Sequence, residues 1–461
     1  MRRTLKRIVV FSVMVLAAGA VARADVKLPS VLAAHMVLQQ GMPVPVWGWA
    51  EPGEAVTVTF AGQTKTAKAD DAGNWRVTLD KLRASAEPRT MTVKGKNEIT
   101  LEDILVGEVW IASGQSNMER WVCVTKDAGK EIAEAAYPNI RLFLVPHVVS
   151  SEPQKDVAAT WVACNSETIQ KFSAVAYYFG REIHREGKVP VGLIATSRTM
   201  TRIEPWMPEP PDPVKPPWDP IKGDYQNPCV LYNGMVHPLI PFAFRGALWY
   251  QGESNVLQKD GMEYLDKQKA LIEGWRKAWG QGDFPFYFVQ IAPLGRWYEQ
   301  GELPALWEAQ TATLAVPNTG MVVIHDTVGG DINNIHPADK QTVGKRLSLW
   351  ALAKVYGRDI TYSGPLYKDM KIDGDKIRLM FDHAGGGLVA SDGQPLTHFT
   401  IAGDDKNFVP AKAEVEGSQI VVSAEGVAAP KAVRFAWEKS ARPNLANKEG
   451  LPASPFRTDK W

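Results

Sequence analysis

Cysteine is scarce in this chain of 461 residues, and only Cys123, Cys164 and Cys229 are present. An odd number of cysteines allows one disulfide at most and leaves one thiol over. CxxC pairs and clusters of cysteine with histidine are also lacking, so no pattern typical of a metal site occurs. We therefore expect the three cysteines to be small, buried, apolar side chains.

An excess of either charge is absent as well. The 52 lysines and arginines nearly balance the 51 aspartates and glutamates, which gives a net charge of +1. This balance favours neither nucleic acid nor an anionic membrane surface as a partner. Hydrophobic residues make up 45% and charged residues 22%, which are the proportions of a folded globular protein. The chain is too long for one ordinary core, so we expect two or three domains.

Long apolar runs are missing beyond the first residues. The N-terminus has a basic segment (MRRTLKR), an apolar segment (IVVFSVMVLAAGA) and a small-residue cleavage site that ends at Ala24, which together indicate a secretory signal peptide. The apolar segment is short for crossing a bilayer, which argues against a membrane anchor. We therefore predict removal of residues 1–24, export to the periplasm or the extracellular space, and no membrane contact afterwards.

The rest of the chain divides into three parts by its pattern. Residues 25–103 and 357–461 alternate short apolar runs with Gly, Pro and Asp, which predicts an N-terminal β-sandwich module and a C-terminal β-rich module. Residues 104–356 alternate apolar strands with amphipathic helices, which predicts an α/β domain whose mostly parallel sheet is flanked by helices. Functional loops of such sheets lie at the carboxyl ends of the strands. The proline-rich segment 207–220 interrupts this domain, either as a loop near the site or as a surface excursion.

A serine follows the first strand of the α/β domain. The segment GQSNM, at positions 114–118, comes directly after the apolar run EVWIAS. A strand, a glycine turn and a helix would place Ser116 at a helix N-terminus, where backbone N–H groups stabilise negative charge. This position suits a nucleophile, although a structural turn serine gives the same pattern. The GxSxG elbow is absent, because position 118 is methionine.

Two further segments offer partners for this serine. In NNIHPADKQ, Pro337 fits the first position of a long helix, so His336 would lie on a loop from which it can act as a general base. His237 is the rival histidine, and a hydrogen-bonded loop role suits it better. In WYQGESN, a buried strand delivers Gln251 and Glu253 into a loop, where a carboxylate can orient an imidazole and an amide can bind an oxyanion.

These motifs occur in a fixed order, with VLQQGMPVPVWGWAEPGE near the start and NLANKEGLPASPFRTDKW at the end. Together they resemble the sialate O-acetylesterase family of carbohydrate acetylesterases, within the SGNH-hydrolase superfamily, over essentially the whole chain after residue 24. The resemblance implies an SGNH-type, flavodoxin-like fold for the middle domain. It also implies Ser116 as the catalytic serine, His336 as the catalytic histidine and Gln251 as an amide of the oxyanion hole, with Gln115 and Asn117 as its neighbours at the substrate.

The catalytic acid is open between two residues. Many SGNH enzymes carry an aspartate three residues before the histidine, and this family often carries one two residues before it, but here these positions are Asn333 and Asn334. The candidates are Glu253 and Asp331. We favour Glu253, because related acetylesterases use the glutamate of this block to orient the histidine.

One departure from the family pattern concerns the oxyanion hole. Where the family reads S-x-G-G-T-x-I-E-x-W, this chain reads TSRTMTRIEPW, with Thr199 and Met200 in place of the glycines. A threonine disfavours positive φ, and we expect Met200 to intrude on the acyl pocket. Losing one oxyanion donor costs about a hundred- to a thousandfold in turnover.

The sequence therefore predicts a serine esterase that removes O-acetyl groups from a carbohydrate through an acetyl-serine intermediate, without a metal or an organic cofactor. The family name implies sialic acid esters, while acetylated plant or microbial glycans suit the same residues. The alternative is a catalytically impaired carbohydrate-binding protein on the same fold, which the Thr199–Met200 departure favours. A lipase fits less well, because the sequence has no apolar lid.

Overall fold

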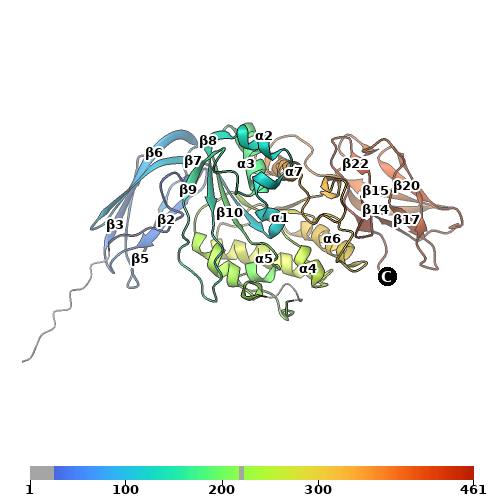
Figure 1. Ribbon diagram of the computed structural model, residues 1–461, viewed down its shortest axis with the longest axis horizontal. Helices are drawn as coiled ribbons and strands as arrows, with labels where there is room; N and C mark the ends of the chain where they lie inside the picture. The colour runs from blue at the N-terminus through green and yellow to red at the C-terminus, as the bar shows by residue number, and fades with distance from the viewer. Residues whose placement is uncertain (1–24, 218–222) are drawn as a thin grey trace, which may run out of the picture.

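The computed structural model describes residues 25–217 and 223–461. The predicted signal peptide, residues 1–24, lies outside the described residues, as do residues 218–222, which include the end of the proline-rich segment 207–220. Figure 1 shows three parts in a row along the long axis, with the α/β domain between two β-rich modules.

A mostly parallel sheet forms the centre of the α/β domain. Its strand order is β13–β12–β11–β7–β10–β8–β9, and β9 pairs antiparallel with β8. Within it, β10–β7–β11–β12–β13 have the order 2-1-3-4-5 along the chain, which is the flavodoxin-like arrangement. The strands are β7 (Glu98–Gly114), β8 (Ala136–Leu144), β9 (Trp161–Asn165), β10 (Val191–Ser197), β11 (Gly246–Tyr250), β12 (Phe286–Val289) and β13 (Thr319–Val322).

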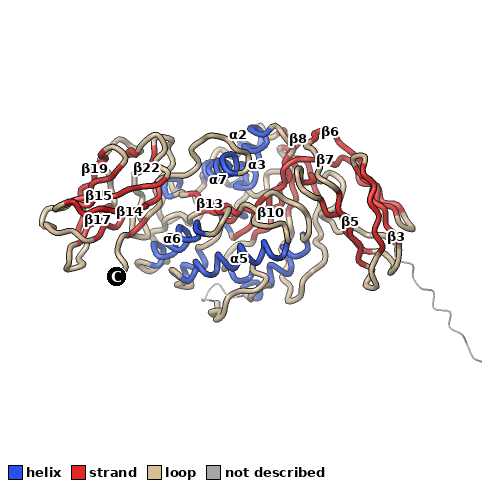
Figure 2. Tube along the Cα trace, turned by 180° about the vertical axis from the view of Figure 1, so that it is seen from behind, coloured by secondary structure: helices blue, strands red, loops and turns tan. Residues whose placement is uncertain are grey.

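Helices cover both faces of this sheet. Helices α3 (Ala174–Gly187) and α7 (Lys340–Lys354) pack together on one face, and α5 (Glu263–Trp279) and α6 (Glu302–Ala312) pack together on the other (Figures 1 and 2). The short helices α1 (Ser116–Glu119), α2 (Ala128–Ala133) and α4 (Glu253–Leu257) follow strand ends or loops. The predicted α/β fold class with helix-flanked sheet is confirmed.

Helix α7 begins later than its sequence pattern predicts. The predicted first position was Pro337, but the helix starts at Lys340 because the Asp339 side chain caps it and accepts a hydrogen bond from the Thr342 N–H at 3.0 Å. Its apolar side is nevertheless buried against the sheet and α3, as the spacing of Val343 and Leu347 predicts.

The N-terminal module shares a strand with the central sheet. The first part of β7 pairs antiparallel with β6 and its last part pairs with β10 and β11, so this strand runs through the predicted boundary between residues 103 and 104. Asp103 has a φ of +54° within β7, and its carboxylate accepts hydrogen bonds from Arg141 at 2.5 and 3.0 Å. The other strands are β1 (Val37–Gln39), β2 (Val44–Trp49), β3 (Ala55–Phe60), β4 (Gln63–Lys68), β5 (Asn74–Leu79) and β6 (Ser85–Lys94).

The C-terminal module has a hydrophobic core of its own, whereas the N-terminal module and the α/β domain share one. Its sheets have the orders β14–β15–β20–β19, β18–β17–β21–β23 and β16–β22. The strands are β14 (Leu366–Asp373), β15 (Lys376–Asp382), β16 (Leu388–Ala390), β17 (Phe399–Ala402), β18 (Val409–Pro410), β19 (Lys412–Glu416), β20 (Gln419–Ser423), β21 (Ala432–Phe435), β22 (Leu445–Asn447) and β23 (Phe456–Arg457).

The three cysteines are free thiols, and their burial differs from the expectation. Cys164 is buried in β9, Cys229 is partly buried and Cys123 is exposed. Burial is thus confirmed for Cys164 and wrong for Cys123, because the 3-10 turn Val122–Val124 buries Val122 and leaves the next side chain outside. Within the described ranges, no helix has the length and apolar character needed to cross a membrane.

Candidate active site

Ser116 lies where the central strand of the sheet ends. Strand β7 ends at Gly114, and α1 begins at Ser116. Gly114 has a φ of +139°, and a Cβ there would come within 2.2 Å of the Tyr250 carbonyl oxygen at the end of β11. Only glycine allows this close approach of two strand ends, so the backbone of the motif delivers Ser116 to the rim of the sheet. The Ser116 residue is 8% exposed.

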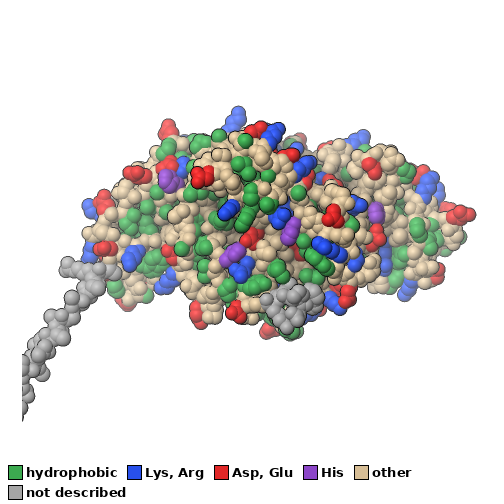
Figure 3. Space-filling model, viewed as in Figure 1, with side chains coloured by type: hydrophobic (Ala, Val, Ile, Leu, Met, Phe, Trp, Pro, Cys, Tyr) green, Lys and Arg blue, Asp and Glu red, His purple; other side chains and the backbone are tan. Residues whose placement is uncertain are grey.

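A pocket of about 300 Å³ opens beside this serine. It lies at the carboxyl ends of the strands where the strand order reverses, which is the usual place of a binding site in an open α/β sheet. Figure 3 shows histidines and basic side chains beside apolar ones on the middle of the molecule's face. The pocket is lined by Ser116, Glu119, Arg120, Trp121, Val124, Thr199 and His336. The structure therefore brings the predicted serine and histidine to one pocket.

His336 is half-buried on the loop that precedes α7, and its backbone N–H donates a hydrogen bond to Asn334 Oδ1 at 3.0 Å. Burial, followed by the positive charges of Arg120 and Lys340, lowers the pKa of His336 to about 4. The imidazole is therefore neutral at neutral pH, which is the state that a general base requires. The rival His237 lies elsewhere, with its ring Nδ1 2.8 Å from the Gln154 carbonyl oxygen.

Asn117 connects the serine turn (residues 114–118) to the histidine loop (residues 331–339). Its side-chain Nδ2 donates to Glu253 Oε1 at 2.5 Å and to the Ile335 carbonyl oxygen at 2.9 Å. Its Oδ1 accepts a hydrogen bond from Lys340 Nζ at 2.5 Å. Asn117, next to Ser116, is thus bound to the backbone of Ile335, next to His336. The oxygen and the nitrogen of the Asn117 amide both have partners within the protein.

Lys340 is a site residue that sequence reasoning missed. It is fully buried, its Nζ lies 5.0 Å from the centre of the Tyr250 ring, and burial lowers its pKa to about 7. A lysine in the first turn of a helix is usually solvated, so its burial has no signal in the local pattern.

Glu253 lies buried at the start of α4. Burial raises the pKa of this carboxyl above its usual range, although the hydrogen bond from Asn117 and the charge of Lys340 act in the opposite direction. Its Oε2 has no hydrogen-bond partner among the described residues. Glu253 contacts the site through Asn117, and no hydrogen bond among the described residues joins it to the His336 ring.

Asp331, the other candidate acid, is exposed on the loop before His336. Its carboxylate accepts a hydrogen bond from the Asn333 N–H at 2.9 Å, which closes a local turn. The structure gives this side chain a role in the shape of the loop and does not bring it to the pocket wall.

The Gln251 side chain is fully buried beneath the site. Its Nε2 lies within hydrogen-bond distance of Gln115 Oε1 (3.1 Å), the Thr201 carbonyl oxygen (3.1 Å) and Asn255 Oδ1 (2.6 Å), and its Oε1 accepts from the Tyr264 hydroxyl at 2.7 Å. The Gln251 amide and the Gln115 side chain therefore tie the ends of β7 and β11 together. Neither belongs to the lining of the pocket.

The turn that replaces the family's glycine pair keeps a glycine-like conformation. Positive φ falls on Met200, at +61°, rather than on Thr199. Met200 is 43% exposed and lies outside the lining of the pocket, which differs from the expected intrusion. The Thr199 N–H and hydroxyl both donate to Glu119 Oε2, at 2.5 and 2.6 Å, so this backbone donor is already engaged.

Glu119 is the second residue that sequence reasoning missed. Its Oε1 forms an ion pair with His147 Nε2 at 3.0 Å. Burial raises its pKa, but the hydrogen bonds from His147 and Thr199 outweigh burial and place the pKa below its usual value. Glu119 is thus an ionised wall of the pocket that holds the turn at Thr199. Within the described ranges, no three histidine, cysteine or acidic side chains lie close enough to hold a metal ion.

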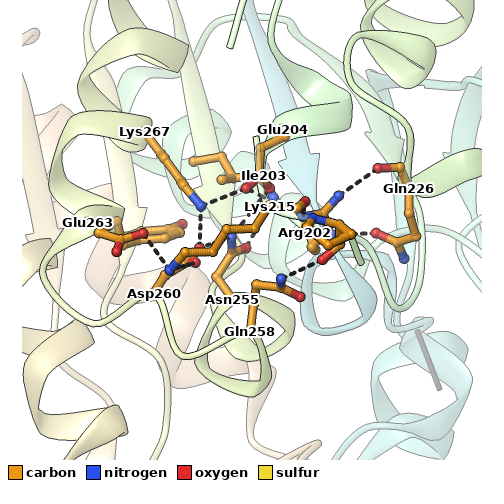
Figure 4. A network of polar contacts seen from close by, with 12 residues as sticks. Arg202, Ile203, Glu204, Lys215, Gln226, Asn255, Gln258, Asp260, Glu263 and Lys267 are labelled. Atoms are coloured by element: carbon orange, nitrogen blue, oxygen red, sulfur yellow. Dashed lines mark hydrogen bonds and ion pairs between the residues drawn. The ribbon is translucent and has the colours of Figure 1, made fainter. Parts of the chain in front are cut away.

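A buried polar network supports the segment that follows this turn (Figure 4). Lys267 Nζ donates to Glu204 Oε1 and Asp260 Oδ2, each at 2.7 Å. Asn255 Oδ1 accepts a hydrogen bond from the Ile203 N–H at 3.1 Å. These contacts join the turn region to α4 and α5, because the buried groups of Glu204 and Ile203 find their partners on those helices.

Comparison with known proteins agrees with this geometry. Residues 106–352 match the family model described as carbohydrate esterase, sialic acid-specific acetylesterase. The sialate O-acetylesterase of Homo sapiens is 30% identical over 475 residues, which cover 91% of this chain and 90% of that protein. The sialate O-acetylesterase of Mus musculus is 31% identical over 412 residues, which cover 73% of this chain and 75% of that protein.

A solved structure is similar over nearly the whole chain. The carbohydrate acetylesterase from Xanthomonas citri matches with a TM-score of 0.89 at 37% identity, and the match covers 95% of this chain and 100% of that one. The chain belongs to the family of sialic acid-specific acetylesterases among the carbohydrate esterases, and it is a carboxylic ester hydrolase.

Proposed function

We propose that Ser116 is the nucleophile and His336 the general base with which this esterase hydrolyses O-acetyl esters of carbohydrates. The observation that carries the proposal is that these two side chains, from segments far apart in the sequence, line one pocket at the switch point of the sheet. Burial keeps His336 neutral at neutral pH, so it is ready to accept the serine proton.

The reaction has two steps. His336 takes the hydroxyl proton as Ser116 Oγ attacks the acetyl carbonyl carbon, and a tetrahedral oxyanion forms. The intermediate collapses, the sugar oxygen leaves with the proton from His336, and an acetyl-serine remains. Water then attacks this ester, His336 takes a water proton and returns it to Oγ, and acetate is released. The Ser116 N–H, in the first turn of α1, has no intrahelical acceptor and is one donor to the oxyanion.

Glu253 supports this pair as a positioning residue, in preference to Asp331. Its carboxyl holds the Asn117 amide, and that amide also binds the carbonyl group of Ile335, directly before His336. Glu253 thereby acts on the serine turn and the histidine loop together. Asp331 is exposed and engaged in its own turn, so its loss leaves these contacts intact.

An exposed aromatic ring supports a sugar as the group that leaves. Trp121 lines the pocket and is 42% exposed, although most large aromatic side chains of this domain are buried. An indole face suits the apolar face of a sugar ring. Acetylated sialic acid follows from the names of the relatives, and other acetylated glycans are alternative substrates because they carry the same acetyl group. Export is part of the proposal and is supported by the signal-peptide pattern of residues 1–24.

The test is acetate release by the chain lacking residues 1–24, from 4-nitrophenyl acetate and from acetylated sugars. Ser116→Ala is expected to lower kcat by about 10⁴-fold or more, because the nucleophile is lost. The matched control, Ser423→Ala in β20 of the C-terminal module, should retain full activity. Sugar binding without acetate release by the unsubstituted protein would favour the alternative of a carbohydrate-binding protein. Activity retained by Ser116→Ala would show that another residue attacks the ester.

A further inference from the structure

Arg120 lines the catalytic pocket, and its guanidinium has no acceptor among the described residues. Its Nε is buried and has no hydrogen-bond partner among the described residues. The Nε atoms of Arg181 and Arg202 also have no hydrogen-bond partner among the described residues, but both of these arginines donate through another nitrogen of the guanidinium, to Glu131 and to the Gln226 carbonyl oxygen. Arg120 differs because none of its guanidinium nitrogens has a hydrogen bond or ion pair within the described residues. Because buried polar groups are normally hydrogen-bonded, Arg120 is placed to donate to an oxygen that the described residues do not supply.

Arg120 also stands in a fixed relation to the nucleophile. It comes four residues after Ser116, and its backbone N–H donates to the Ser116 carbonyl oxygen at 2.9 Å. Residues four apart around a helical turn lie on the same side, so the two side chains reach the same pocket. The charge of Arg120 is also felt by His336, whose pKa it lowers after the larger effect of burial.

Two of the oxyanion donors that the family pattern offers, the Gln251 amide and the Thr199 N–H, are used elsewhere in this chain. The Gln251 amide lies in the buried network between β7 and β11. The Thr199 N–H donates to Glu119. An esterase with fewer donors would lose much of the stabilisation of its tetrahedral intermediate, and a charged donor is a strong replacement because charge-assisted hydrogen bonds are stronger than neutral ones.

We propose that Arg120 is a catalytic residue that donates hydrogen bonds to the oxyanion, in place of the Gln251 amide and the Thr199 N–H. Attack by Ser116 turns a neutral serine and a neutral imidazole into an oxyanion and an imidazolium. A guanidinium beside an imidazolium is unfavourable alone, and the oxyanion between them offsets both positive charges. The inference rests on the proposed roles of Ser116 and His336.

A neutral ester separates this role from recognition of an acidic sugar. A carboxylate on the substrate would also suit Arg120, but 4-nitrophenyl acetate carries none. With this ester, Arg120→Gln is expected to lower kcat about a hundredfold or more while KM changes little, and Arg120→Lys should recover part of the loss. The control Arg185→Gln, an exposed position on α3, should match the unsubstituted protein.

The pH profile provides a readout that a merely structural role would not move. The charges facing His336 are Arg120, directly after α1, and Lys340 from α7, and Glu119 lines the same pocket. His336 must be neutral to act, so kcat/KM falls as the pH drops through its pKa of about 4. Removing the charge of Arg120 raises this pKa, and the acid limb of Arg120→Gln should lie at higher pH.

Two results would overturn the inference. One is an Arg120→Gln variant with full kcat on the neutral ester, even if it lost acidic sugars. The other is that Arg120→Gln and Arg120→Lys lose the same kcat, while the acid limb of Arg120→Gln stays at the pH of the unsubstituted protein. This pair of results would indicate a structural defect. Ser116→Ala is measured beside these variants, and its activity alone decides the proposed function, so failure of one proposal is distinguishable from failure of the other.

Discussion

At the scale of single residues, the Asn117 side-chain amide connects the segments that carry Ser116 and His336. Asn117 receives a hydrogen bond from Lys340 and donates to Glu253 and to the Ile335 carbonyl oxygen. A buried amide with all its groups paired has one favourable orientation, so it transmits the position of each neighbour to the others. The serine turn and the histidine loop are held in register by this contact, although no covalent or strand pairing joins them.

The two candidate acids can be separated at this scale. Glu253→Gln keeps the shape but replaces one acceptor of the Asn117 amide with a group that also donates, so we expect kcat to fall about tenfold to a hundredfold through displaced catalytic groups. Asp331→Asn is the matched control and should stay within about twofold, because its side chain serves a local turn. Measurement of kcat beside the urea midpoint separates displacement from unfolding. A larger loss for Asp331→Asn than for Glu253→Gln would reverse the assignment.

At the scale of elements, the ends of β7 and β11 approach closely at Gly114. A Cβ added at Gly114 would lie 2.2 Å from the Tyr250 carbonyl oxygen, and the φ of Gly114 is +139°, so this position has no room for a side chain. Next to this approach, the Gln251 side chain donates a hydrogen bond to the Gln115 side chain, which joins the ends of β11 and β7 beside Ser116. The turn before the nucleophile is therefore part of the sheet's own packing.

Gly114→Ala tests this element. We expect a loss of at least about 2 kcal/mol in the free energy of unfolding, together with lower kcat, because the new methyl group pushes the strand ends apart. The control is Gly129→Ala in α2, where a Cβ meets nothing within 4 Å and a gain of up to about 1 kcal/mol is expected. Urea unfolding of both variants gives the comparison. Stability equal to that of the unsubstituted protein for Gly114→Ala would show that the approach is not required.

At the scale of the whole molecule, the C-terminal module is joined to the α/β domain by polar contacts between two separate cores. His325, just after β13, lies with its Nε2 3.1 Å from the Ala453 carbonyl oxygen, and Gln290 contacts Ser454 at 3.0 Å. Arg457 of β23 forms an ion pair with Glu308 of α6 at 3.0 Å. Aromatic contacts add to these polar ones, because the Trp350 ring of α7 packs against Tyr362, with ring centroids 4.6 Å apart.

His325 makes this junction sensitive to acid. Burial lowers its pKa to about 4, and the ordinary value near 6.5 applies after unfolding. Between these values the unfolded chain binds a proton that the folded chain does not, so its contribution to stability is complete above about pH 6.5 and is lost as the pH falls toward 4. We expect the urea midpoint of His325→Gln to fall less between pH 7 and pH 4.5 than that of the unsubstituted protein. An equal fall in both would assign the acid sensitivity to other groups.

Much of this molecule is readable from the sequence alone. The alternation of strands and helices in residues 104–356, the β pattern on either side and the GQSNM and IHP motifs are local features, because side-chain periodicity and turn chemistry act over a few residues. The resemblance of several ordered motifs to one family then implies the catalytic roles of Ser116 and His336.

Only the tertiary structure decides which polar groups around the serine are engaged. Gln251 and Thr199 have the chemistry of oxyanion donors in sequence, but their hydrogens are directed to Asn255 and Glu119. Arg120 has no distinguishing pattern in sequence, and it differs from other buried arginines because its guanidinium has no acceptor in the part of the chain that the structure describes. The physical reason is that a hydrogen-bond partner is a matter of position in space, and here the partners come from segments that meet only when the sheet is complete.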